Sequence, residues 1–154
     1  VIAPQDVDGA VYLADATGAD VLQVHGSLGA SELLELKGRV HQKIVVALSA
    51  QTELEEARRI AASVDAVLLD TFAGGVLGGT GRVHDWERSA RLAAGLTVPV
   101  ILAGGLHPGN VADAICRVRP YAVDASSGLE TEGRKDEQKM AGFVREVRAC
   151  PPQQ

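Results

Sequence analysis

Five short apolar runs recur along the chain and predict a parallel β-sheet. Each run is continuous or nearly so, as is typical of parallel strands that are buried on both faces. The runs begin near residues 20, 44, 66, 98 and 121, so they recur about every 23 residues, with one longer interval of about 32. Their ranges are 20–25, 44–48, 66–70, 98–103 and 121–124.

The segments between these runs have apolar residues at helical spacing and carry helix-capping residues. An Asp, Ser or Thr side chain before a helix accepts hydrogen bonds from its first N–H groups, and a glycine often follows its last turn. The expected caps are Asp8, a capping box of Thr52 and Glu55, Asp85 and Asp136, with Gly18 and Gly95 at two helix ends. Alternating strands and helices predict an α/β fold with a parallel sheet.

The spacing favours a closed barrel over a doubly wound sheet. Residues 26–29 follow the first run but lack the G-x-G-x-x-G pattern of dinucleotide-binding folds. Eight strand–helix units of about 23 residues need about 185 residues plus loops. The 154 residues supply about five units, and residues 1–4 are similar to the end of a strand. We expect an N-terminally truncated (β/α)8 TIM barrel, with 1–149 as one partial domain and 150–154 as a disordered tail.

Composition excludes several classes of partner. The formal net charge is −5 and no basic run occurs, which argues against a nucleic-acid partner. No apolar run is long enough for a membrane-spanning helix, and the N-terminus lacks a signal-peptide pattern. The two cysteines lack the spacing of metal ligands, and Cys116 is expected to be a small buried residue inside a helix. We therefore expect a cytoplasmic protein without a metal site.

Two carboxylates and a histidine end the predicted strands, where barrel enzymes carry their chemistry. Asp70 ends a buried run, so its carboxyl is a candidate general acid, and Asp124 has the same position. The alternative for both is a turn or helix cap. His25 is a candidate acid, base or phosphate contact, or else a hydrogen-bonded residue of the rim. The loop 71–85 holds five glycines and is either a lid or a flexible connection.

Two glycine-rich loops follow the last two strands and predict a phosphate site. Gly104 and Gly105 separate a strand from a helix, so their N–H groups can approach an anion at the helix N-terminus. Ser126, Ser127 and Gly128 follow the next strand and add hydroxyl and N–H donors. Barrels commonly bind phosphate between their last two strands. The fold expected is therefore a barrel of the phosphate-binding type.

Taken together, these segments resemble the phosphoribosylanthranilate isomerase family of tryptophan biosynthesis. The similarity runs from about residue 20 to 143 and keeps the family's order and nearly its spacing. The matching segments are QVHG (23–26), LLDT (68–71), GGTG (78–81), DW (85–86), LAGGLHPGNV (102–111), VDASSGLE (123–130) and GRKD (133–136).

The resemblance implies an Amadori rearrangement, in which a phosphorylated aminoaldose becomes an aminoketose without a cofactor. By motif position, Asp70 would be the general acid and Asp124 would lie beside the substrate amine. The loop residues named above, Gly104, Gly105, Ser126, Ser127 and Gly128, would bind the phosphate, and His25 and Gly79 would line the substrate pocket. The partner expected is a small phosphorylated molecule.

One family segment has no counterpart among these residues. The family's general base is a cysteine in a Lys-x-Cys-Gly segment of the first strand, and neither Cys116 nor Cys150 occupies such a position. One hypothesis is an isomerase whose first strands precede Val1. Another is an inactive remnant, or a half-barrel that binds a phosphate ligand and pairs as a homodimer through its open edges. A different phosphate-binding barrel enzyme, such as indole-glycerol-phosphate synthase, is disfavoured because no lysine ends a predicted strand.

Overall fold

A single curved parallel sheet organises the computed structural model, which describes residues 1–26, 28–70 and 85–151. Its strands pair in the order β1-β2-β3-β4-β5, and every pairing is parallel. The prediction of five parallel strands is confirmed. A doubly wound sheet reverses its strand order at a switch point, and this sequential order does not. The strands are β1 (Val21–Val24), β2 (Lys43–Ser49), β3 (Ala66–Asp70), β4 (Val100–Leu102) and β5 (Ala122–Val123).

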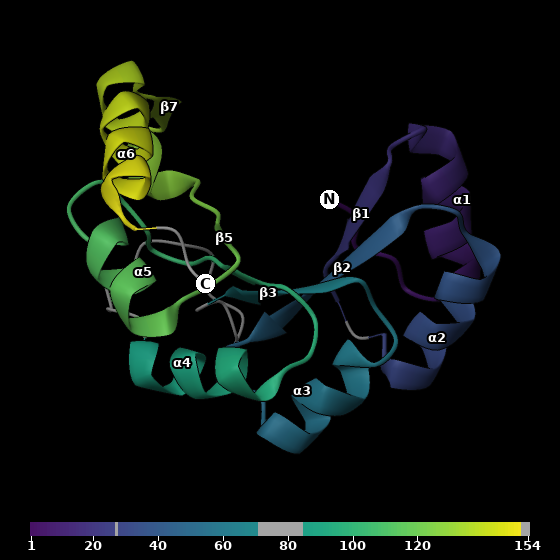
Figure 1. The fold of residues 1–154 in the computed structure, drawn as a ribbon. Helices are drawn as coiled ribbons and strands as arrows, with labels where there is room; N and C mark the ends of the chain where they lie inside the picture. The colour runs from purple at the N-terminus through teal and green to yellow at the C-terminus, as the bar shows by residue number, and fades with distance from the viewer. Residues whose placement is uncertain (27, 71–84, 152–154) are drawn as a thin grey trace.

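Helices connect successive strands and lie along the outer side of the curved sheet (Figure 1). This one-sided cover also distinguishes the fold from a doubly wound sheet, whose helices cover both faces. Beyond β5 the chain forms a short 3-10 turn, η1 (Ser127–Leu129), and a small hairpin of β6 (Glu130–Thr131) and β7 (Arg134–Lys135). The helices are α1 (Val7–Thr17), α2 (Ala30–Arg39), α3 (Leu54–Ala61), α4 (Trp86–Gly95), α5 (Val111–Val118) and α6 (Glu137–Ala149).

Each central strand buries apolar side chains on both faces, which explains the continuous apolar runs. On the helix side, Val46, Val67 and Leu102 belong to the large core that the helices complete. On the concave side, Val45, Leu68 and Ala103 form a second, smaller cluster. Successive residues of a strand point to opposite faces, so the two clusters alternate along each strand. The edge strand β1 differs on its concave side.

The helix caps confirm part of the sequence analysis. Asp85 accepts from the N–H of Arg88, Asp136 accepts from those of Gln138 and Lys139, and Gly18 ends α1 in the left-handed region at φ 58°. These contacts supply acceptors for N–H groups that have no partner inside the helix. The Thr131 hydroxyl and these N–H groups also lower the pKa of Asp136.

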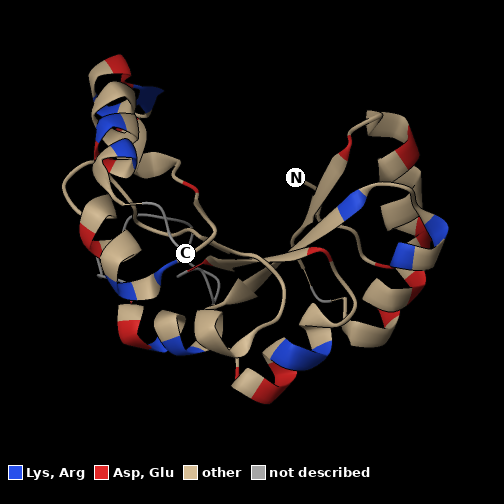
Figure 2. Cartoon of the chain, in the orientation of Figure 1, with Lys and Arg blue, Asp and Glu red and all other residues tan. Residues whose placement is uncertain are grey.

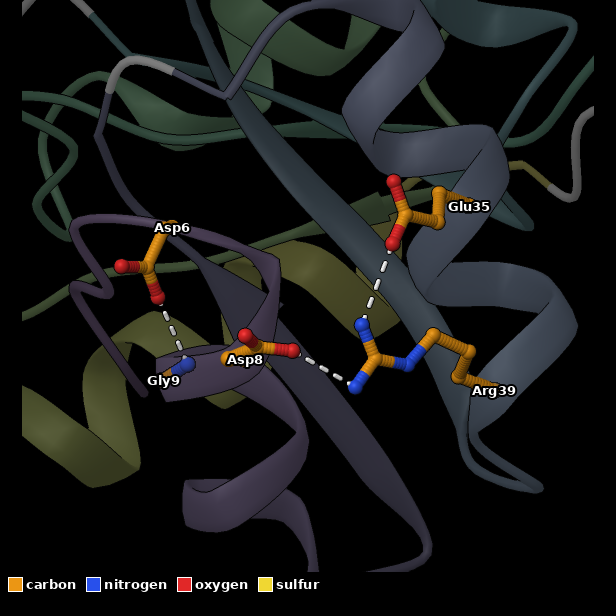
Figure 3. Close-up of polar contacts among 5 residues, drawn as sticks. All are labelled: Asp6, Asp8, Gly9, Glu35 and Arg39. Atoms are coloured by element: carbon orange, nitrogen blue, oxygen red, sulfur yellow. Dashed lines mark hydrogen bonds and ion pairs between the residues drawn. The ribbon is translucent and has the colours of Figure 1, made fainter.

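Two predicted caps are wrong. The cap of α1 is Asp6, whose Oδ1 accepts from Gly9 N at 2.7 Å, because the helix begins two residues before the predicted start (Figure 3). Asp8 lies inside the first turn and instead pairs with Arg39 of α2 at 2.7 Å. The cap of α3 is Glu53 rather than Thr52, and it makes no side-chain capping bond. The exposed carboxylate of Glu53 instead pairs with Arg88 of α4 at 2.7 Å.

The outer helices carry the charged residues in mixed signs, with Lys and Arg interspersed among Asp and Glu (Figure 2). Within the described ranges, no helix is long and apolar enough to span a bilayer. The prediction that Cys116 is buried is wrong. Cys116 lies on the exposed side of α5, and its neighbour Ile115 lies on the buried side.

Asp65 ties the beginnings of β2 and β3 to α2. Its backbone and its side chain both contact Ile44: the N–H of Asp65 donates to the Ile44 carbonyl, and the Ile44 N–H donates to the carboxylate Oδ2 of Asp65, both at 2.9 Å. Lys37 and Lys43 lie 3.5 and 3.4 Å from Oδ1. Burial alone would raise the pKa of Asp65, but the Ile44 N–H and the two ammonium groups together lower it.

We predict that Asp65→Asn destabilises the fold by about 2 kcal/mol at neutral pH, because a half-buried charged hydrogen bond is lost. The lowered pKa means that the folded state binds the carboxyl proton less readily than the unfolded chain does. The stabilisation is therefore complete above the ordinary carboxyl pKa and disappears as pH falls through the lowered one. Urea unfolding of both proteins across acid and neutral pH measures this. Asp15→Asn, on the exposed side of α1, is the control, and equal stabilities of Asp65→Asn and the parent at neutral pH would contradict the prediction.

Candidate functional site

The register of the sheet places Asp70 and Asp124 in one row at the carboxyl end of the strands. Leu69 pairs with Leu102 and Leu102 with Val123, so the next positions along the three strands are Asp70, Ala103 and Asp124. Asp124 N donates to Leu102 O at 2.9 Å and Ala103 N to Leu69 O at 2.8 Å. The backbone positions of Asp70 and Asp124 are two strand spacings apart, about 10 Å. Because Leu69 and Val123 pack on the helix side, the alternation turns both carboxylates toward the concave side.

The neighbouring residues give the two carboxylates different surroundings. Asp70 is half-buried and also pairs in register with Ser49 at the end of β2. Asp124 is exposed. The half-buried carboxyl has less access to water than the exposed one, so the two acids are suited to different tasks.

The loop after β4 makes two left-handed residues, Gly104 at φ 85° and Gly105 at φ 64°. A glycine adopts this region at no steric cost, and the turn it allows leads into α5. Asn110 fixes the loop, since its side chain accepts from His107 N at 2.8 Å and donates to Gly105 O at 3.0 Å. The sequence analysis missed Asn110, although its position before a helix is a strong capping signal.

The loop after β5 packs directly against the loop after β4, and Gly128 is the point of contact. A Cβ at Gly128 would lie 2.0 Å from the Leu106 carbonyl oxygen, so no larger residue fits without moving the backbone. His107 and Pro108 of one loop and Ser127 and Gly128 of the other line a shallow pocket of about 380 Å³, together with Lys139 of α6. The two glycine-rich loops expected to act together are thus in contact.

Two lysines from beyond the loops hold the second loop in shape. The sequence analysis assigned a role to neither of them. Lys135 Nζ donates to Ser126 O and Oγ at 3.2 Å and pairs with Glu130 at 2.7 Å. Lys139 Nζ donates to Glu130 O at 2.5 Å. The hairpin that carries Lys135 turns through Glu132 and Gly133, both with positive φ, as in a two-residue hairpin of the primed type. A Glu-Gly pair between two short polar runs was the available signal.

His25 lies away from these loops. It follows β1, the opposite edge of the sheet from β5, and its Nε2 lies 2.8 Å from Gln23 Nε2. It is half-buried, on the concave side like Asp70. Gly79 and the glycine-rich segment 71–84 lie outside the described residues.

The two cysteines lie far from the strand ends that carry the carboxylates. Cys116 occupies the second half of α5, which starts beside the glycine loop and runs away from it. Cys150 follows α6 as its C-cap, donates from Sγ to Glu146 O and packs against the core, and this burial raises the pKa of its thiol. Among the described residues, no three His, Cys, Asp or Glu side chains gather as metal ligands.

Comparison with known proteins returns one consistent result. A family model described as N-(5'-phosphoribosyl)anthranilate (PRA) isomerase matches residues 1–146. The N-(5'-phosphoribosyl)anthranilate isomerase of Methanothrix thermoacetophila is 54% identical over 97% of this chain and 71% of its own length. The structure of phosphoribosyl anthranilate isomerase from Thermococcus kodakaraensis is 33% identical with a TM-score of 0.73, covering 94% of this chain and 70% of the other.

A further structure adds a ligand on a similar fold. It is a phosphoribosyl anthranilate isomerase in complex with reduced 1-(o-carboxyphenylamino)-1-deoxyribulose 5-phosphate, abbreviated rCdRP. It is 25% identical to this chain with a TM-score of 0.71, covering 96% of this chain and 69% of the other.

We predict that Gly128→Ala separates the two loops and destabilises the protein by about 1–3 kcal/mol, the usual range for an overpacked site. The new methyl group meets a backbone carbonyl, which cannot rotate out of the way as a side chain could. Thermal unfolding measures the loss. Gly38→Ala is the matched control, because its Cβ meets nothing within 4 Å and α2 gains a better helix former. An unfolding temperature for Gly128→Ala equal to that of the parent would refute the close approach.

Proposed function

The chain belongs to the N-(5'-phosphoribosyl)anthranilate isomerase family, and we propose that its strand-end site binds the phosphorylated substrate of that reaction and acts on its sugar. The family match spans residues 1–146, and the 54% identity to one relative extends over 97% of the chain. The isomerase family predicted from the motifs is therefore confirmed. The observation that carries the proposal for the site is the row of Asp70 and Asp124 beside two glycine loops in contact.

We propose that the five strands adopt the arrangement of consecutive strands in a (β/α)8 barrel of the phosphate-binding type. Their sequential parallel order and one-sided helices support this, as does a TM-score of 0.73 to a relative over 94% of the chain. In such barrels the functional groups lie at the carboxyl ends of the strands. Asp70, Asp124 and both glycine loops follow the carboxyl ends of their strands.

The phosphate is proposed to bind between the two glycine loops. Within the described part of the chain, the N–H groups of Gly104, Gly105, Ser126, Ser127 and Gly128 donate to no other residue. Converging N–H groups without internal acceptors form a favourable site for an anion. Lys139, which lines the pocket between the loops, adds positive charge.

Asp70 is proposed as the general acid and Asp124 as the acceptor for the substrate amine. In this scheme Asp70 protonates the ribose ring oxygen while the C1–O bond breaks and the amine lone pair forms a protonated Schiff base. Removal of the C2 proton by a base gives an enolamine, which becomes the aminoketose when C1 gains a proton and the C2 hydroxyl loses its proton to form the carbonyl. Asp124 beside the amine would stabilise its positive charge. The separation of about 10 Å between the two strand positions leaves room for a pentose carbon chain between the side chains.

Neither cysteine of the chain is suited to remove the C2 proton, because both belong to helices on the outer side of the sheet. The second candidate function is a domain that binds the phosphorylated ligand without converting it. Incubation of the chain with substrate separates the two. Binding of rCdRP together with turnover supports the isomerase, whereas binding without turnover supports the second candidate.

We predict that Asp70→Asn lowers kcat by about 10²–10⁴-fold, the usual contribution of one acid–base group, while rCdRP binds with nearly unchanged affinity. The amide keeps the shape of the carboxyl but has no acidic proton to give to the ring oxygen. Steady-state kinetics and calorimetry measure the two quantities. Asp113→Asn, exposed on α5, serves as the control. An Asp70→Asn protein with the parent's kcat would exclude this carboxyl as the acid.

We predict that Gly105→Ala weakens binding of inorganic phosphate roughly tenfold, because the strained φ displaces the N–H donors of the loop. Gly18→Ala is the matched control: both glycines have positive φ, and at both positions a Cβ would meet nothing within 4 Å. Both variants should lose about 1–2 kcal/mol of stability, yet only the first should bind phosphate more weakly. Titration of the backbone amide signals measures binding. Equal affinities in the two variants would contradict the loop assignment.

A further inference from the structure

The edge strand β1 carries a polar pair on its concave side, in contrast to the apolar pairs of β2 and β3. Leu22 and Val24 pack into the helix-side core, so the alternation turns Gln23 and His25 to the concave side. Gln23 pairs in register with Val45, which belongs to the concave apolar cluster. A half-buried amide beside an apolar cluster needs a partner, and its partner is the imidazole two residues further along the strand.

The backbone of this pair is fixed by residues near the N-terminus. Ile2 N donates to Gln23 O, and His25 N donates to Ile2 O, both at 2.9 Å. Ile2 is buried and bridges Val24 in a parallel arrangement. These contacts hold both ends of the Gln23–His25 segment, so the geometry of the two side chains rests on an ordered backbone.

The contact points to one of the two neutral tautomers of His25. Gln23 Nε2 lies 2.8 Å from His25 Nε2, and an amide NH₂ group can only donate. With the amide in this orientation, His25 Nε2 accepts and the ring proton lies on Nδ1. The two ring nitrogens point in nearly opposite directions in the plane, so Nδ1 is turned away from Gln23. None of the described residues accepts a hydrogen bond from Nδ1.

We propose that Gln23 is a positioning residue that holds His25 as the Nδ1–H tautomer, so that His25 meets the substrate as a neutral hydrogen-bond donor. With Nε2 engaged by Gln23, Nδ1–H is the donor that the ring has left for a ligand. A substrate oxygen is the acceptor that this donor would meet. This part of the inference rests on the proposed function, whereas the tautomer does not. His25 therefore acts by donation through Nδ1 and not as a base through Nε2.

A two-bond proton–nitrogen correlation spectrum of the labelled protein distinguishes the tautomers directly. The chain has four histidines, and a His25→Asn variant assigns the signal of His25. We expect Nδ1–H in the parent. Gln23→Glu replaces the donor by an acceptor of the same size, so we expect the proton to move to Nε2 or the ring to become doubly protonated. Nε2–H in the parent, or an unchanged pattern in Gln23→Glu, would overturn the proposal.

A binding experiment tests whether the tautomer matters to the ligand. Losing one neutral hydrogen bond to the ligand should weaken rCdRP binding roughly tenfold in Gln23→Glu and in Gln23→Leu. Gln51→Glu adds the same charge at an exposed position beyond β2 and should leave the affinity unchanged. Unchanged affinity in both Gln23 variants, with the tautomer altered, would overturn the role of His25 as a ligand donor.

Two further results keep this inference separate from the proposed function. If the parent does not bind rCdRP, the proposed function fails, and the spectrum still decides the tautomer. If Gln23→Glu does not fold, Gln23→Asn replaces it, because its amide is too short to reach the ring. A parent-like histidine signal in Gln23→Asn would then contradict the assignment of Gln23 as the positioning residue.

Discussion

The parallel register of β2, β3 and β4 is the constraint on which the rest of the molecule depends. Because these strands bury both faces, a shift by one residue would turn every side chain to the opposite side. Val46, Val67 and Val100 would then leave the helix-side core, and the polar strand ends would leave the concave side. The pairing that stabilises the core therefore also places Asp70 and Asp124 in one row. Folding and chemistry depend on the same register here.

The loops beyond that row are held by a contact that only glycine permits. The backbone at Gly128 approaches the Leu106 carbonyl so closely that the loops after β4 and β5 form one surface. Asn110 on one side donates to the Gly105 carbonyl, and Lys135 on the other adds a second donor to the Ser126 carbonyl, which also accepts from Leu129 N. Both side chains bind carbonyl groups and leave the N–H groups of the glycines and serines proposed to bind phosphate unengaged. The proposed anion site would therefore be built from backbone geometry, with side chains as supports.

The sequence predicted most of the fold, because apolar runs and their spacing report parallel strands directly. It also predicted the strand-end position of Asp70 and Asp124, since the carboxyl ends of parallel strands share an edge. It failed where two residues compete for one role: Asp6 and Asp8 are both good caps, and only the start of the helix decides between them. The prediction for Cys116 was wrong for a similar reason. A helix buries only one side, and on α5 that side carries the neighbouring Ile115.

Gln23 could not be identified as a functional candidate from pattern alone. Within β1, Gln23 is the one polar residue among apolar neighbours. The sequence does not reveal which side chain its amide contacts. The curvature of the sheet then decides whether the pair belongs to the same site as Asp124. In a flat sheet, β1 and β5 would lie four strand spacings apart, about 19 Å, which exceeds the reach of a small substrate. Figure 1 shows the sheet bending so that β1 and β5 face one another across the concave side. In the proposed barrel arrangement, a substrate with its phosphate at the glycine loops would extend across the mouth toward β1 and its Gln23–His25 pair.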